Sequence, residues 1–322
     1  MNPSIETPGG EGMSGESGED IRIARGDAQA VVTVRGAGLR SYRVGARDVV
    51  VPYPGPTPPA MHGAILAPWP NRLADGRYEF NGRSYQLPVT EPARRAANHG
   101  FVHDQAWEVS DRSEDSVELR FFIDGELEGY PFPLELRVRY ALGDKGLAVT
   151  FTAANRGETA APFGVGFHPW LSPGAAGVDE CELRVAASGW VRANERLLPV
   201  EFCALPAEKD FLTPRSLRGV SLDDGFAPAV FAGERTWAEL RSPDGMMSAV
   251  WAERPLEYWQ ICTGDFPEIG VFERSGVAAE PMSCPADAFN SGRGLATLQP
   301  GETYTVRWGL CLRRTGDHAR PV

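Results

Sequence analysis

Two adjoining stretches of this chain alternate apolar and polar residues with a period of two. Residues 134–142 read LELRVRYAL, residues 147–155 read LAVTFTAAN, and the turn GDKG lies between them. Such alternation is typical of antiparallel strands that bury one face. No window of a dozen residues carries the apolar spacing of an amphipathic helix. The pattern therefore predicts an all-β fold.

Strand-like runs recur along the whole chain. The clearest local signal is RYEF-NG-RSYQL at 77–87, because Asn81 and Gly82 tolerate the positive φ angles of a two-residue hairpin turn. The other predicted strands lie at 30–34, 116–123, 181–187, 236–240, 246–252, 257–264 and 303–313. The 36 glycines and 27 prolines fall mostly between these runs. No repeat or linker divides residues 21–318, which we predict to form one large antiparallel β-sandwich domain.

Charge and composition narrow the class of partner. A formal net charge of −11 argues against a nucleic-acid surface and against an anionic membrane, so we expect neither partner. No apolar run approaches the ~18 residues that a membrane span needs. The five cysteines are scattered without a CxxC pair, which is typical of reduced thiols in a cytoplasmic protein. Residues 1–20 lack the marks of a signal peptide and are expected to be a disordered leader.

The segment HGAILAPWPNRLADG, residues 62–76, is the first of four that carry more than a connecting loop needs. Trp69 stands between two prolines, and Arg72 follows at once. An aromatic face and a guanidinium at a fixed spacing suit a sugar, whose ring stacks while its hydroxyls take hydrogen bonds. The alternative is a rigid surface turn with a half-buried tryptophan.

The second segment is ANHGFVH, residues 97–103, which holds His99 and His103. Gly100 argues against a helix that would bring both imidazoles to one metal ion, and the segment offers only Asp104 as a further ligand. We therefore expect no metal site. His99 is then either a hydrogen-bonding or catalytic group or a structural one. Because the chain has no glycine-rich dinucleotide or phosphate loop, we also expect no nucleotide cofactor.

The third and fourth segments each contain one titratable residue in apolar surroundings. FGVGFHPW, residues 163–170, holds His168, and on its own a packed histidine bonded to backbone is the commoner explanation. AAEPMSCPADAFNSG, residues 278–292, holds Glu280 between small apolar residues and a proline. Desolvation would raise the pKa of this carboxyl group toward the range of a general base. The alternative is an ordinary loop glutamate paired with an arginine.

Taken together and in chain order, five motifs resemble the aldose 1-epimerase (galactose mutarotase-like) family. They are PWPNRLADGRYEFNGRSYQL, NHGF, FGVGFHPWL, SLDDGF and AAEPMSCPADAFNSGRGLATLQPGET, and the resemblance extends over residues 29–313. It implies a large antiparallel β-sandwich (the galactose mutarotase-like supersandwich), in agreement with the predicted strands. It also implies an isomerase that interconverts the α and β anomers of a hexose without a metal or a cofactor.

The resemblance implies a role for each matching residue. His168 would be the acid that protonates the sugar ring oxygen, and Glu280 the base that takes the proton of the C1 hydroxyl. His99 would form a hydrogen bond near the ring oxygen. The expected substrate-binding residues are Arg72, Asp223, Trp69 and Trp170. Within SLDDGF the adjacent Asp224 leaves the choice of aspartate open by one position.

Two other functions remain open at this stage. A hexose-6-phosphate 1-epimerase of the same fold would need a cationic pocket, for which Arg94 and Arg95 are the adjacent arginine pair near a predicted catalytic motif. A non-catalytic sugar-binding or regulatory protein would not need both His168 and Glu280. For any of these functions we expect a monomer or a weak homodimer.

Overall fold

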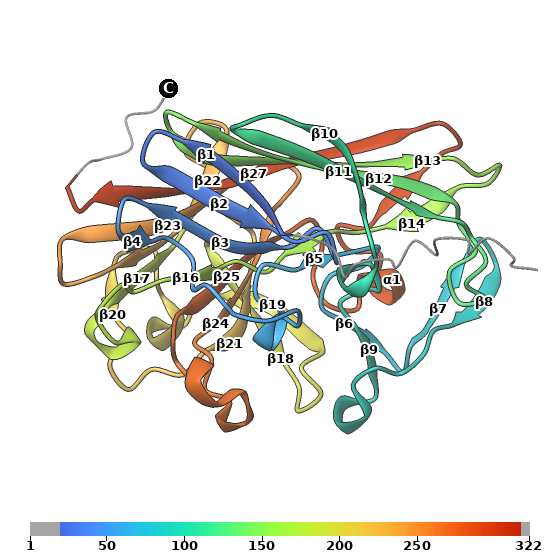
Figure 1. Cartoon of the computed structure of the whole chain (residues 1–322). Helices are drawn as coiled ribbons and strands as arrows, with labels where there is room; N and C mark the ends of the chain where they lie inside the picture. Colours follow the sequence, from blue (N-terminus) through green and yellow to red (C-terminus); the bar gives the residue numbers. More distant parts are fainter. Residues whose placement is uncertain (1–19, 317–322) are drawn as a thin grey trace, which may run out of the picture.

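The computed structural model describes residues 20–316, and two large antiparallel sheets dominate it (Figure 1). The first has nine strands in the order β10-β11-β12-β13-β27-β23-β22-β17-β20. Their bounds are β10 (Glu108–Arg112), β11 (Ser116–Ile123), β12 (Leu134–Gly143), β13 (Gly146–Asn155), β27 (Thr303–Arg314), β23 (Met246–Glu253), β22 (Arg235–Arg241), β17 (Glu182–Val185) and β20 (Arg215–Ser216). The second has eight strands in the order β19-β18-β21-β24-β25-β15-β5, with β16 also paired to β25. Their bounds are β19 (Pro199–Ala204), β18 (Gly189–Ala193), β21 (Asp223–Phe226), β24 (Tyr258–Cys262), β25 (Val277–Met282), β15 (Gly166–Phe167), β5 (Ile65–Leu66) and β16 (Trp170–Leu171).

Smaller elements complete the fold. One sheet has four strands, β1 (Ile21–Arg25), β2 (Ala28–Val32), β3 (Leu39–Val44) and β4 (Arg47–Asp48). Three strand pairs are β14 (Ala161–Phe163) with β26 (Ala296–Leu298), β6 (Arg72–Ala74) with β9 (Ala96–Asn98), and β7 (Arg77–Phe80) with β8 (Arg83–Gln86). The helical segments are α1 (Ala288–Ser291) and the 3₁₀ turns η1 (Pro59–Met61), η2 (Pro92–Arg94), η3 (Val102–Asp104), η4 (Val178–Glu180), η5 (Ala207–Lys209) and η6 (Pro267–Phe272).

The predicted all-β sandwich is confirmed. Strands β12 and β13 pair along their whole length, and the side chains of β12 alternate between buried and partly exposed. The predicted hairpin at 77–87 is β7 and β8, and its turn residues Asn81 and Gly82 have φ angles of 49° and 73°. The expected leader, 1–20, lies outside the described residues apart from Asp20.

The two large sheets enclose the main core, and the alternation of side chains decides what faces it. In Figure 1 strands β10 to β13 and β27 lie above β18, β21 and β24. Phe167 of β15 packs on Phe151 and Trp308 of the nine-stranded sheet. The next residue, His168, therefore points away from that sheet. The eight-stranded sheet thus has one face in the core and a second face that is available for a site.

The helical segments of the described chain are all short. None of them is long and apolar enough to cross a membrane.

Candidate active site

One row of side chains crosses the free face of the eight-stranded sheet. Gly225 of β21 pairs with Gln260 of β24, which in turn pairs with Glu280 of β25. His168 lies opposite Glu280, because β15 and β16 on either side of it both pair with β25. Register partners project to the same face of a sheet. Pairing therefore brings together Gln260, Glu280 and His168, which are far apart in the chain.

The backbone around His168 is held on both sides by the segment that follows η1. The His168 N–H donates to the carbonyl of Ala64 at 3.0 Å, and the N–H of Gly63 donates to the His168 carbonyl at 2.8 Å. Gly166 allows the loop before β6 to pack closely, because a Cβ at this position would lie 2.8 Å from Cβ of Pro70. The glycine spacing of FGVGFHPW thus serves close packing around the imidazole.

His168 and Glu280 form a buried pair. Nε2 of His168 lies 3.4 Å from Oε1 of Glu280, and the residues are 7% and 2% exposed. This contact is longer than the 2.7–2.9 Å of a charge-assisted hydrogen bond. Within the described residues neither Nδ1 of His168 nor Oε2 of Glu280 has a hydrogen-bond partner. The geometry is therefore that of two uncharged groups in contact rather than of a tight ion pair.

Burial sets the protonation of this pair. It raises the pKa of Glu280 well above its usual value; the charge of Asp223 adds to the rise and Arg72 opposes it. Burial also lowers the pKa of His168 to about 3, with a smaller contribution from His62. Burial thus favours the uncharged form of both groups, in which the pair holds one transferable proton. Transfer of that proton from Glu280 to His168 yields a carboxylate base beside an imidazolium acid.

The backbone conformation at His99 places its ring next to the His168–Glu280 pair. It follows β9 with a φ angle of 62°, and its N–H donates to the carbonyl of Asn71 at 2.9 Å. Its Nδ1 accepts the N–H of Asn71 at 3.1 Å, so the ring proton is on Nε2. Burial, followed by the charge of His168, lowers the pKa of His99 well below its usual value. The ring, 5.7 Å from that of His168, is a neutral hydrogen-bond donor.

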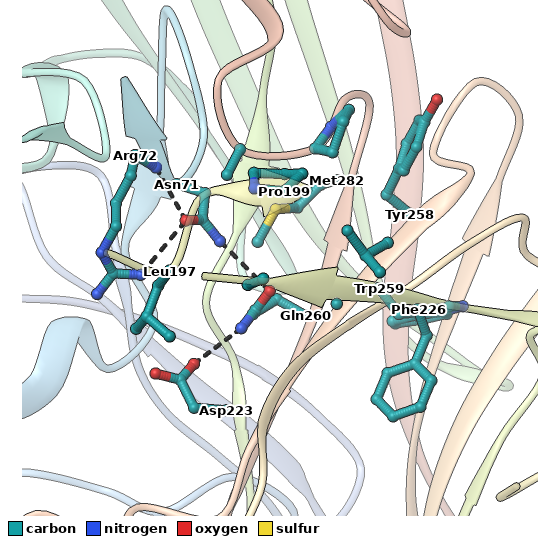
Figure 2. A pocket seen from close by; sticks show the side chains of 15 residues that line it. Asn71, Arg72, Leu197, Pro199, Asp223, Phe226, Tyr258, Trp259, Gln260 and Met282 are labelled. Atoms are coloured by element: carbon teal, nitrogen blue, oxygen red, sulfur yellow. Dashed lines mark hydrogen bonds between the residues drawn. The ribbon is translucent and has the colours of Figure 1, made fainter. Parts of the chain in front are cut away.

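Four polar side chains form a chain beside this cluster (Figure 2). Nη1 of Arg72 donates to Oδ1 of Asn71 at 3.4 Å, and Nδ2 of Asn71 donates to Oε1 of Gln260 at 3.3 Å. Nε2 of Gln260 donates to Oδ1 of Asp223 at 2.8 Å. All four line an open cavity of about 450 Å³, whose other walls include Val191, Leu197, Tyr258 and Met282. The cavity offers a strip of donors and acceptors next to apolar surface, which is the composition of a sugar site.

A carboxylate holds Arg72 in place. Glu91 accepts from Nε of Arg72 at 2.6 Å and from Nη2 at 3.1 Å, and it also accepts from Nη1 of Arg94 at 2.6 Å. Although burial by itself raises it, these arginines bring the pKa of Glu91 below its usual value. Arg95 pairs with Asp75 at 2.6 Å. Both arginines of the candidate phosphate pocket are therefore paired with carboxylates, Glu91 being shared with Arg72 and Asp75 with Arg196.

The structure distinguishes the two aspartates of SLDDGF. Asp223 lines the cavity and accepts from Gln260. Asp224 accepts from Nε1 of Trp190 at 2.7 Å and from Nζ of Lys209 at 2.6 Å. It points away from the cavity, because successive side chains of a strand face opposite sides. Of the pair, only Asp223 is placed to contact a ligand there.

Neither predicted tryptophan offers a ring face to the cavity, so this part of the sequence interpretation is corrected. Trp69 is 4% exposed, donates from Nε1 to the carbonyl of Ala97 and packs against Phe101 and Phe289. Trp170 is 1% exposed, and the imidazoles of His62 and His168 both stack with its ring. Both rings are enclosed by neighbours, and packing rather than sugar stacking explains them.

Sequence reasoning missed Gln260, Asn71 and Glu91. Gln260 had a visible signal, since it is a polar residue between the core residues Trp259 and Ile261 of a predicted strand. The other two had none, because their roles depend on contacts with Arg72 and Gln260. In residues 20–316 no cluster of three or more His, Cys, Asp or Glu side chains has an arrangement that could hold a metal ion.

This chain is similar to known proteins over most of its length. The family model described as aldose 1-epimerase matches residues 19–310. The chain is 33% identical over 301 residues to YihR, an uncharacterized protein of Escherichia coli K12, covering 92% of this chain and 94% of that protein. It is 27% identical over 265 residues to the galactose mutarotase of Mus musculus, covering 75% and 76%.

Solved structures share the same fold. A galactose mutarotase-like protein from Clostridium acetobutylicum superposes with a TM-score of 0.83 at 19% identity, covering 92% of this chain and 96% of that chain. A putative aldose 1-epimerase from Escherichia coli K12 superposes with a TM-score of 0.79 at 24% identity, covering 92% and 99%. At these identities the likeness concerns the fold alone.

Proposed function

The chain belongs to the aldose 1-epimerase family, and on that premise we propose that it is a mutarotase for an unphosphorylated aldohexose. The observation that carries the proposal is the buried His168–Glu280 pair beside the polar chain that includes Arg72 and Asp223. The ion pairs of Arg94 and Arg95 with carboxylates count against a phosphorylated substrate.

The chemistry requires one acid and one base. A cyclic aldose is a hemiacetal, and opening it moves one proton from the C1 hydroxyl to the ring oxygen. Glu280 as carboxylate accepts the hydroxyl proton while the bond between C1 and the ring oxygen breaks, and His168 as imidazolium protonates that oxygen. The aldehyde turns about C1–C2. On closure His168 takes its proton back and Glu280 returns its own to the carbonyl oxygen, which leaves the other anomer.

The single proton held by the pair suits this cycle. In the sugar-free site it resides on Glu280, because burial favours both uncharged forms. A C1 hydroxyl that donates a hydrogen bond to Glu280 favours the carboxylate and so shifts the proton to His168. Nε2 of His99 is then a neutral donor for an oxygen near the ring oxygen. Arg72 and Asp223 bind the remaining hydroxyls.

The test of the function is polarimetry on freshly dissolved sugars. The optical rotation of α-glucose, α-galactose and glucose 6-phosphate is followed with and without the protein. We expect faster decay with at least one unphosphorylated sugar. Acceleration confined to glucose 6-phosphate would support the phosphosugar reading instead. Binding of sugars without any acceleration would support a non-catalytic sugar-binding protein.

The pH profile is expected to lack the usual histidine inflection. Activity needs one proton on the pair, so it falls when acid adds a second proton or base removes the first. The pKa of His168 is lowered to about 3, and that of Glu280 is raised. We therefore expect kcat/KM, corrected for buffer catalysis, to change by less than about twofold between pH 7 and pH 5, with the acid loss lying below that range. An inflection near pH 6.5 would contradict this.

The two neighbouring aspartates provide a matched pair of variants. Asp223→Asn removes a charged acceptor from the cavity, and we expect KM to rise about tenfold, as for the loss of a hydrogen bond to a charged group. Asp224→Asn, which faces Trp190 and Lys209, should leave KM within about twofold. Initial-rate polarimetry over a range of sugar concentrations measures both. Equal effects on KM would refute the assignment of Asp223.

A further inference from the structure

The candidate acid His168 is one of three planar side chains whose rings lie nearly parallel to one another. The rings of His62 and Trp170 have centroids 4.5 Å apart and planes 5° apart. The rings of Trp170 and His168 have centroids 5.8 Å apart and planes 16° apart. His62 and Trp170 are each 1% exposed. Trp170 thus stacks with two imidazoles, one of which belongs to the site.

Packing rather than hydrogen bonding holds the plane of the His168 ring. Its Nδ1 is buried and has no hydrogen-bond partner in the described part of the chain. Its Nε2 has only the 3.4 Å contact with Glu280. The remaining neighbours are Trp170 on one face and His99 at an interplanar angle of 72°. Any tilt of Trp170 therefore changes the direction in which Nε2 points.

Trp170 is in turn fixed by the segment around η1. Its Nε1 donates to the carbonyl of Ala60 at 3.2 Å, and the ring of His62 stacks on it. Nδ1 of His62 donates to the carbonyl of Pro59, which sets the rotation of its ring. The edges of Tyr53 and Phe272 close the outer side of His62.

This arrangement explains a histidine at position 62. The site of the side chain is apolar, and burial lowers the pKa of His62 to about 4, so the ring is neutral. A neutral imidazole combines a flat face for stacking with one N–H anchor to backbone. His62 and Trp170 are each 1% exposed and are packed among other rings, so we assign neither a contact with the sugar.

We propose that His62 is a positioning residue: it holds Trp170 flat, and Trp170 holds the imidazole of His168 in the plane that faces Glu280. The inference rests on the proposed function, because the plane of His168 matters to the reaction only if this ring is the acid. The proposal predicts that substitutions of His62 that remove the ring lower kcat and leave KM nearly unchanged. Binding depends on Arg72 and Asp223, which lie outside the stack.

Variants at position 62 distinguish the effect of a flat aromatic ring from the effect of side-chain volume. His62→Phe keeps an aromatic face, His62→Leu fills similar space without one, and His62→Gln keeps a donor for the Pro59 carbonyl without a ring. We expect kcat of His62→Phe to stay within about threefold of the unaltered protein. We expect kcat of both ringless variants to fall about tenfold, with KM within about twofold, since a misoriented acid costs rate rather than binding. Equal kcat for His62→Phe and both ringless variants would overturn the proposal.

A spectroscopic readout tests the stack without any activity. The carbon-bound protons of the His168 imidazole lie beside the Trp170 ring, and NMR of the full chain reports their position through the ring current. These signals, identified by their loss in His168→Asn, should move in His62→Leu and His62→Gln but stay in place in His62→Phe. If the protein accelerates no sugar, this result still decides whether His62 orients His168. Unmoved signals in all three variants would refute the proposal, and thermal unfolding identifies a variant that does not fold.

Discussion

Glu280→Gln is expected to lower the mutarotase kcat at least a hundredfold while the protein stays folded. Glutamine keeps the shape of the side chain but cannot accept the proton of the C1 hydroxyl, and a positioned acid or base contributes ~10²–10⁴ in rate. The measurement is polarimetry at saturating sugar, with Glu234→Gln, a change at an exposed glutamate, as the matched control. Near-normal mutarotation by Glu280→Gln would refute the role of Glu280.

The same substitution is expected to stabilise the protein at neutral pH. Because burial raises the pKa of Glu280 above its ordinary 4.5, its protonated form favours the native state below that pH. This contribution is lost as pH rises toward the native-state pKa, since the unfolded chain releases the proton first. Glutamine carries no such penalty. We expect the melting temperature at pH 8 to be higher for Glu280→Gln than for the unaltered protein.

Thermal unfolding at two pH values checks this sign. The gain of Glu280→Gln over the unaltered protein should be larger at pH 8 than at pH 4, where both forms are uncharged in either state. Glu234→Gln should show no such difference. An equal gain at both pH values would mean that Glu280 is not held protonated by burial. If Glu280→Gln loses activity and also gains a pH-dependent rise in melting temperature, then Glu280 lowers the stability of the protein while serving catalysis.

His168→Ala is the second substitution with a large expected effect, again at least a hundredfold in kcat. Without the imidazole no side chain at this position protonates the ring oxygen. Ring opening must then produce an alkoxide or take a proton from water, and both routes are slower. Sugar binding should persist, because Arg72, Asp223 and Gln260 are untouched. Calorimetric titration with the accelerated sugar separates these two quantities.

The control for His168→Ala is again Glu234→Gln, the change at an exposed glutamate. It should retain kcat within about twofold, as surface substitutions away from a site usually do. Near-normal mutarotation by His168→Ala, or an equal loss in both variants, would refute the assignment of His168 as the acid.

Much of the fold follows from local pattern. The predicted strand at 116–123 is β11, and those at 134–142 and 147–155 differ from β12 and β13 by one residue. Period-two alternation is a local consequence of the pleat, so a short window carries it. By contrast, no strand was predicted around Glu280, which lies in β25, because an unbroken run of small buried residues shows no alternation.

The candidate site shows the same difference between features set by local sequence and features set by tertiary contacts. The motifs that resemble the family pointed to His168, Glu280, His99 and Arg72. The structure places His168 and Glu280 on one face of the eight-stranded sheet, and the separate β6–β9 pair brings Arg72 and His99 beside them. The orientation of Trp69 and Trp170 was misread, because a flanking proline does not reveal which neighbours enclose a ring. Glu91 was missed, because its link to Arg72 joins residues nineteen positions apart.

The sequence by itself determined the all-β class and most strand positions, since these depend on local period, while the candidate acid, base and binding residues came from its resemblance to a known family. Only the tertiary structure decided that Asp223 rather than Asp224 faces the cavity, that both candidate tryptophans are enclosed, and that Arg94 and Arg95 are paired with carboxylates. The reason is the same in each case. Strand register and loop packing choose the neighbours of a side chain, and its neighbours determine its charge, exposure and direction.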